Sequence, residues 1–178
     1  MYDEPSCAVS TGRQVVMSRE EQSPNERDGP IEWIYRMVQR YDFESSFSAF
    51  MGAFAIFGFL PVVPGPCGLY QWKYMKGKPL KWYFKLVNKP PEESGLILSN
   101  LKIAEDRILS YSSVLKTSTR TKMCVNPNAE FYFEAETELG QFAKQRRRWI
   151  NGTFAGYVYM LSHPNLIFDS HMSPLRKL

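Results

Sequence analysis

The stretch from Gln145 to Trp149 holds the residue types best suited to chemistry: three consecutive arginines between a glutamine and a tryptophan. Arg stays charged at physiological pH, and its planar fork can bond two phosphate oxygens at once. Trp presents the largest flat apolar face, with one N–H donor at its edge. The run can therefore hold a phosphate group beside a stacked ring. It is equally typical of a solvated basic turn of a helix whose Trp faces the core.

A long helix is predicted to carry this run. It begins near Glu138 and continues to His163, and its second half, from Ile150 to Leu161, is apolar and aromatic. A strand is predicted over 122–133, because apolar residues recur there at even spacing: Met123, Val125, Phe131 and Phe133. The strand therefore leads into the helix that presents the arginines.

A second group of reactive types, Glu105-Asp106-Arg107, lies upstream. The pattern over 92–115 predicts a loop and a helix, with this trio near the helix start, where the helix dipole favours carboxylates. The helix position alone is enough to explain the two acidic residues. The trio therefore has two interpretations: carboxylates that stabilise the helix start, or a carboxylate that acts as a catalytic base.

The remaining elements frame these two groups. A short strand with a turn at Gly12 is predicted over 8–16, a loop over 23–30, and an amphipathic helix from Ile31 with Pro30 at its first position. Residues 47–63 carry no charge, but Pro61 ends the run before the roughly 20 residues that cross a bilayer. We expect a buried or interfacial helix there, running into a strand.

Composition sets limits on function. With 178 residues and 44% hydrophobic content the chain is one globular domain's worth, and 15% aromatic residues suit a membrane surface or flat ligands. A net charge of +4 is too small to indicate nucleic acid by itself. Three dispersed cysteines indicate a reducing compartment, and two histidines leave little for a zinc site or a His-based triad.

A second basic region keeps another class of function open. Residues 71–91 interleave six lysines with aromatic rings. Together with Arg146–Arg148 they could form a basic aromatic binding module that contacts anionic membrane or single-stranded nucleic acid. Such a module has no need of Asp106.

Taken in order, the motifs resemble a known family. Glu105-Asp106-Arg107 followed by Gln145-Arg146-Arg147-Arg148-Trp149-Ile150-Asn151-Gly152-Thr153 is similar to the processive glycosyltransferases of family 2, and within it to chitin synthase. Cellulose and hyaluronan synthases share the Gln-x-x-Arg-Trp pattern, but the triple Arg and the Glu-Asp-Arg trio favour chitin synthase. Residues 63–70 and 39–44 resemble two further family motifs, and the resemblance covers about residues 31–160. It implies an α/β fold: part of a nucleotide-sugar glycosyltransferase fold with interfacial amphipathic helices.

The resemblance also implies an activity. Chitin synthases transfer N-acetylglucosamine from UDP-N-acetylglucosamine to a growing β-1,4 chitin chain with inversion, which requires a base for the acceptor hydroxyl. The resemblance implies that Asp106 is the catalytic base and that Glu105 and Arg107 support it. It also implies that the diphosphate and the acceptor are bound by Gln145, Arg147, Arg148 and Trp149. Pro64 and Gly65 would form an acceptor or channel loop.

Two family features are missing from the sequence. It contains no Asp-x-Asp, so ligands for the family's divalent metal (Mg or Mn) are not expected in this chain, and no apolar run reaches spanning length. We therefore expect a fragment, inactive alone: a polar segment over 1–30 from a truncated catalytic domain, the C-terminal half of that domain over 31–163, and a tail over 164–178 leading toward a membrane region. The resemblance implies a plasma-membrane enzyme with a cytoplasmic catalytic face, no nucleic-acid partner, and room for a homo-oligomer at full length.

Overall fold

The computed structural model describes residues 6–177, which form a mixed α/β fold around a three-stranded sheet. The central strand is β1 (Cys7–Val16), which pairs antiparallel with β2 (Gly68–Tyr70) and parallel with β3 (Lys122–Phe133). The expected strands over 8–16 and 122–133 are thus confirmed. Gly12 is not at a turn but at a register shift in the β1–β3 ladder, and a Cβ there would lie 2.3 Å from the Ala129 carbonyl oxygen. Close approach of two strands is therefore the reason for this glycine.

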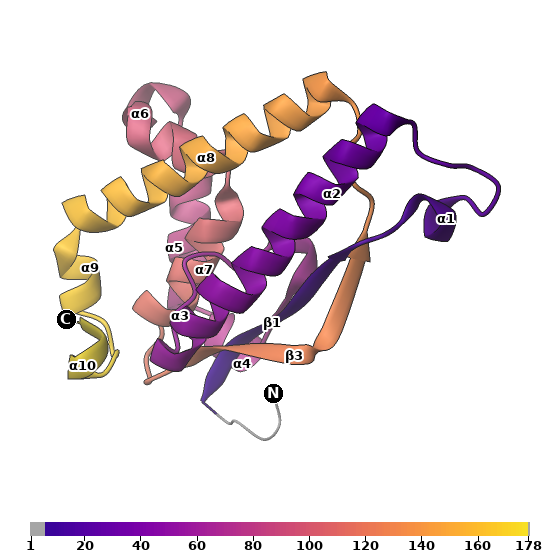
Figure 1. Ribbon diagram of the computed structural model, residues 1–178. Coiled ribbons are helices and arrows are strands. Elements are labelled where there is room, and N and C mark those ends of the chain that lie inside the picture. Colours follow the sequence, from indigo (N-terminus) through magenta and orange to yellow (C-terminus); the bar gives the residue numbers. More distant parts are fainter. Residues whose placement is uncertain (1–5, 178) are drawn as a thin grey trace.

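Helices surround the sheet (Figure 1). Those before β2 are α1 (Arg19–Gln22), α2 (Pro30–Ser45), the π-helical segment η1 (Ser46–Met51), α3 (Gly52–Phe57) and the 3₁₀ turn η2 (Gly65–Cys67). Those between β2 and β3 are α4 (Trp72–Met75), α5 (Lys78–Val87), α6 (Pro91–Lys102) and α7 (Glu105–Leu115). The last three are α8 (Leu139–Ser162), α9 (Pro164–Phe168) and α10 (Pro174–Lys177).

Three apolar clusters hold these elements together, and two of them fix the place of α7. One joins the sheet to the segment after α3 and to α7, through Val9, Leu60, Val63, Val114 and Met123. The other joins α6, α7 and α8 through Leu98, Leu101, Ile108, Ala155 and Tyr159. Because α7 belongs to both clusters, its first turn has a fixed place relative to both the sheet and α8.

The helix α2 begins at Pro30 as predicted, but its apolar stripe points outward. Ile31, Ile34, Val38 and Tyr41 are between 50% and 77% exposed. The side turned inward is polar: Arg36 is 2% exposed and bonded to Asp28 at 2.7 Å, and Gln39 is fully buried. The apolar periodicity was sufficient to predict the helix. Which side of α2 is buried is decided by the hydrogen bonds that Arg36 and Gln39 make inside the protein.

Other expectations need correction. Residues 47–63 form η1 and α3 and then a loop, not a helix that runs into a strand. The basic aromatic region is largely helical, as α4 and α5, and the single helix expected within 92–115 is two helices, α6 and α7. The prediction that the acidic trio starts a helix is confirmed, since α7 begins at Glu105. In the described part of the chain, none of the helices combines the length and apolar character that a bilayer crossing requires.

Candidate active site

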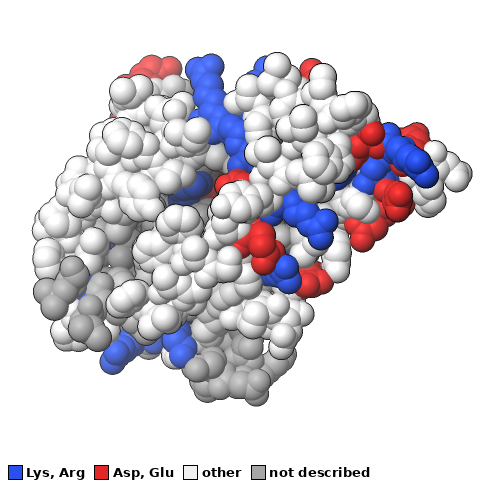
Figure 2. Space-filling model, in the orientation of Figure 1, with Lys and Arg blue, Asp and Glu red and all other residues white. Residues whose placement is uncertain are grey.

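The two predicted motifs line one cavity of about 1040 Å³. Its walls come from β1, α2 and η1, the loop before β2, the start of α7, the end of β3 and the middle of α8. Figure 2 shows the corresponding hollow, where Lys, Arg, Asp and Glu side chains gather between largely uncharged areas. The predicted site residues in its lining are Pro64, Gly65, Glu105, Asp106, Arg107, Gln145, Arg148 and Trp149. Arg147 does not line it.

Asp106 lies in the first turn of α7 and is half-buried. Its Oδ1 accepts a hydrogen bond from the Arg107 backbone N–H at 2.8 Å and lies 3.5 Å from the Arg107 guanidinium. Burial raises the pKa of Asp106 above its ordinary value, and the Arg107 charge opposes that shift. A carboxylate with a raised pKa in a cavity wall is a better proton acceptor than one in water.

Arg107 connects the two motifs. Its guanidinium is buried and donates to the Thr153 hydroxyl on α8. The Thr153 hydroxyl in turn donates to the Trp149 carbonyl oxygen at 2.7 Å. The acidic trio and the tryptophan are therefore joined by a short chain of polar contacts through residues that are 46 positions apart.

Two glycines allow this approach. A Cβ on Gly152 would lie 2.4 Å from the Ala104 Cβ, and one on Gly156 would lie 2.7 Å from the Tyr111 hydroxyl oxygen. Any larger residue would push α8 away from the start of α7. The glycines therefore set the distance across which Arg107 reaches Thr153.

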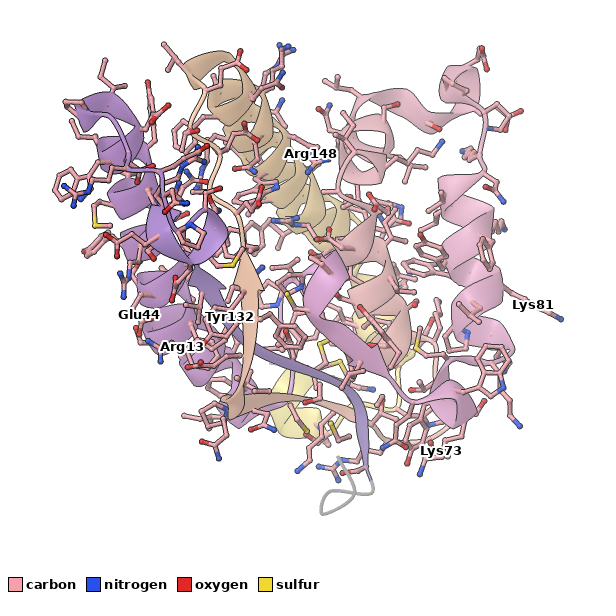
Figure 3. All side chains as sticks on the ribbon, turned by 90° about the vertical axis from the view of Figure 1, so that its right-hand side faces the viewer. Arg13, Glu44, Lys73, Lys81, Tyr132 and Arg148 are labelled. Atoms are coloured by element: carbon pink, nitrogen blue, oxygen red, sulfur yellow. The ribbon has the colours of Figure 1, made fainter. Side chains whose placement is uncertain are left out.

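The three arginines have different surroundings. Arg146 is half-buried and forms an ion pair with Asp42 of α2. Arg147 is exposed and does not line the cavity, whereas Arg146 and Arg148 both line it. Figure 3 shows Arg148 beside α8, far from the labelled Lys73 and Lys81. Since Arg146 is paired with Asp42, Arg148 is the arginine better placed to meet an anion in the cavity.

Trp149 lies among aromatic rings. Its ring meets Phe43 of α2 edge-to-face, with centroids 5.7 Å apart, and Phe43 in turn meets Phe133 of β3 at 4.5 Å. The neighbouring Gln145 has a buried side-chain oxygen without a hydrogen-bond partner in the described part of the chain. A fixed ring and a free acceptor beside it are suited to a sugar, which presents both an apolar face and hydroxyl donors.

The loop at Pro64 and Gly65 is attached to the same turn of α7. The Val63 backbone N–H donates to the Ser110 hydroxyl at 2.9 Å, and Ser110 donates to the Asp106 carbonyl oxygen at 2.8 Å. Pro64 is half-buried, and Gly65 is exposed at the cavity rim. The loop therefore keeps a constant position relative to the Asp106 turn.

The described residues hold no cluster of metal-ligating side chains. No group of three His, Cys, Asp or Glu side chains comes together in residues 6–177, and the cavity lining contains the neighbouring carboxylates of Glu105 and Asp106. Mg²⁺ in enzymes is commonly bound by one or two carboxylates together with substrate phosphates and water.

Sequence reasoning missed several residues of the site. Asp42 and Phe43 line the cavity from α2, and Thr153 links the motifs. Asp42 and Phe43 fall in the 39–44 segment that resembles a family motif, so that resemblance was the available signal. No pattern in the sequence indicated that Arg146 would bond Asp42, which is 104 positions away.

Comparison with known proteins agrees with this geometry. Residues 32–164 match the chitin synthase-like glycosyltransferase domain. The chain is 33% identical over 126 residues to chitin synthase 2 of Mycosarcoma maydis, covering 70% of this chain and 12% of that protein. It is 34% identical over 126 residues to chitin synthase A of Ampelomyces quisqualis, covering 68% of this chain and 14% of that protein. For chitin synthase 2 of Rhizopus oligosporus the identity is 30% over 129 residues, with 70% and 15% covered.

The chain thus spans only 12–15% of the length of these relatives. The matched residues nevertheless include both motifs and every cavity wall except the part of β1 that contributes Gln14. The resemblance inferred from the motifs is confirmed: the chain belongs to the chitin synthase-like glycosyltransferase family.

Proposed function

We propose that this chain provides the acceptor side of a chitin synthase active site. In the complete site, N-acetylglucosamine is transferred from UDP-N-acetylglucosamine to the end of a β-1,4 chitin chain with inversion. The observation that carries the proposal is that Glu105–Arg107 and Gln145–Trp149 line one cavity and are linked through Thr153. A basic surface patch would not need this connection.

The roles follow from the surroundings of each residue. Asp106 takes the proton of the acceptor hydroxyl as that oxygen attacks the anomeric carbon, and Arg107 and Glu105 hold its turn in place. As the bond to the diphosphate breaks, negative charge develops on the leaving group, and Arg148 lies in the same cavity to stabilise it. Trp149 stacks on the acceptor sugar, and Gln145 accepts one of its hydroxyl hydrogens.

Acceptor binding tests the proposal directly. We expect the 178-residue chain to bind chitotetraose in isothermal titration calorimetry, and Trp149→Ala to reduce the affinity at least about tenfold. Trp72→Ala is the matched control, because Trp72 is exposed and does not line the cavity. Equal affinities of the two variants would refute the acceptor assignment.

Donor chemistry gives a second test. The sequence holds no Asp-x-Asp, and the described residues form no metal cluster. We therefore expect no incorporation of labelled N-acetylglucosamine into polymer by the purified chain with UDP-N-acetylglucosamine and Mg²⁺. Polymer formed by this chain alone would contradict the proposed division of the site, including the boundaries at residues 30 and 163.

We further propose that α2 and α8 rest on a membrane surface. On α8, Leu139 and Leu161 lie outside the cavity and are 63% and 81% exposed, whereas the exposed Ile150, Phe154 and Tyr157 also line the cavity. The helix α2 carries a further outward-facing apolar stripe. Figure 1 shows both helices in front of the sheet and of α5–α7. Helices with one exposed apolar side lie in the headgroup region of a bilayer. This supports contact with a membrane surface. A plasma-membrane location with the cavity on the cytoplasmic side, and homo-oligomer formation, stay predictions.

Co-sedimentation with vesicles tests the proposed membrane contact of α2 and α8. The chain should co-sediment with vesicles of phosphatidylcholine and phosphatidylserine, and Leu139→Glu combined with Leu161→Glu should release it, since both leucines are exposed outside the cavity. Lys81→Glu combined with Lys85→Glu on α5 is the control. If the control pair releases the chain and the α8 pair does not, the lysine face is the contact and the basic binding module is favoured.

A further inference from the structure

Three residues on one side of α2 contact α8 or the segment just before it. Gln39, Asp42 and Phe43 lie on one side of α2, since residues three and four apart are neighbours on a helix. Gln39 bonds the segment before α8, Asp42 bonds Arg146, and Phe43 meets Trp149. None of these contacts is needed to close the apolar core, which is formed by other residues.

Gln39 fixes where α8 starts. Its fully buried amide donates to the Glu136 carbonyl oxygen at 2.8 Å and accepts from the Glu136 N–H at 3.1 Å. Both backbone polar groups of Glu136 are therefore satisfied by one side chain. The chain enters α8 three residues later with its direction set by α2.

Arg146 then connects α2 to the ring of Trp149. Its guanidinium carbon lies 4.7 Å from the Trp149 ring centroid and 5.0 Å from that of Phe142, while one of its nitrogens donates to Asp42. Its Nε and second terminal nitrogen are buried, and in the described residues they have no hydrogen-bond partner. The group is therefore held by one carboxylate and by aromatic faces, a geometry that fixes the plane of each ring it covers.

We propose that Asp42 and Arg146 are positioning residues that orient the Trp149 ring for the acceptor sugar. The inference rests on the proposed function, because it assumes that Trp149 meets the sugar. Asp42 aims the Arg146 guanidinium, and the guanidinium holds the indole from the side of Phe142 while Phe43 holds its edge. The first arginine of the run thus acts on the tryptophan and not on the diphosphate.

Fluorine NMR with 5-fluorotryptophan gives a readout that overall stability does not. The chain has four Trp, and Trp149→Phe assigns the resonance of Trp149. We expect Asp42→Asn and Arg146→Met to shift or broaden that resonance while the other three stay in place. Chitotetraose affinity should fall about tenfold in both variants, because the loss of an aimed cation–ring contact is of that size.

Conservative variants separate positioning from structure. Asp42→Glu keeps the carboxylate and should restore both the resonance and the affinity. Arg146→Lys keeps the charge but not the planar stack, so the affinity should stay low. Lys144→Met is the matched control from the same helix, since Lys144 is exposed and outside the cavity.

The outcomes distinguish this inference from the proposed function. Unchanged affinity in Trp149→Ala would refute the acceptor role itself. Loss of binding in Trp149→Ala, with an unmoved Trp149 resonance and full affinity in Arg146→Met, would refute only the positioning role. Should Asp42→Asn fail to fold, a folded Arg146→Met with wild-type affinity still overturns the proposal.

Discussion

Two helices of this protein, α5 and α8, each carry a run of basic and aromatic residues, yet the structure treats them differently. In α5, Lys78, Lys81 and Lys85 are exposed, and in the described part of the chain none of them has an ion-pair partner. In α8, Arg146 bonds Asp42 and lies over three rings, and Arg148 lines a cavity that also holds Asp106. Composition alone does not separate the two.

The difference comes from what lies opposite each run. The lysines of α5 face water, and their helix is held by the rings of Trp82 and Tyr83 on its other side. Arg146 and Arg148 of α8 line the cavity that α2, α7 and β3 enclose, whereas Arg147 lies outside it. A charge run thus becomes a site only where other elements supply a carboxylate, a ring and an enclosed volume. We expect substitutions in the two helices and around the cavity to test this difference, and they are given in decreasing order of effect.

The largest effect is expected at Asp106. In an intact chitin synthase that carries residues 32–164 of this chain, Asp106→Asn should lower turnover at least about 100-fold, because general-base catalysis contributes on that scale. UDP-N-acetylglucosamine affinity should be nearly unchanged. Glu93→Gln on α6 is the control, an exposed carboxylate outside this cavity. Turnover that survives in the Asp106 variant would remove the base assignment and weaken the contrast between α8 and α5.

A stability effect of about 1–3 kcal/mol is expected at Gly152, as for other overpacked contacts. Gly152→Ala places a methyl group where Ala104 already lies, so the free energy of unfolding in urea should fall. Gly140→Ala, in the first turn of the same helix, meets only the end of the Glu138 side chain and should be neutral or stabilising. Equal effects would mean that α8 does not need its close approach to α7.

Anion binding compares the two runs directly. Arg148→Met should weaken pyrophosphate binding to the chain about tenfold, since one charge-assisted hydrogen bond is worth about 1.5–3 kcal/mol. Lys81→Met should leave it unchanged. The opposite ranking, together with salt-dependent binding of single-stranded DNA that Lys81→Met reduces, would favour the binding-module alternative.

The smallest effect concerns pH. Because burial raises the pKa of Asp106, the folded chain holds its proton to higher pH than the unfolded chain does. The contribution of Asp106 to stability should therefore fall as pH rises from below the ordinary Asp pKa to above the raised one, and remain level beyond it. Groups with a lowered pKa, such as Asp28, act in the opposite direction and cancel when the wild type is compared with Asp106→Asn. Asp106→Asn lacks this loss, so its advantage in urea unfolding should grow over that window, by no more than about 2 kcal/mol. An advantage that shrinks with rising pH would mean that the Arg107 pair outweighs burial.

Much of the local structure was predictable from the sequence. Even spacing over 122–133 predicted β3, Pro30 marked the start of α2, and the acidic trio marked the start of α7. These features depend on neighbours in the chain, which propensity and periodicity describe. The two motifs were sufficient to identify the family because residue type and order alone specify them.

The assembly of the site was decided only by tertiary structure. Contacts such as Arg146–Asp42 and Arg107–Thr153 join residues far apart in the chain, and no local pattern specifies them. The same holds for α2, whose apolar stripe faces outward because Arg36 and Gln39 find buried partners inside. The sequence therefore determined which residues are able to do chemistry, whereas packing around α7 determined which of them meet, because burial and pairing energies arise only between elements brought together.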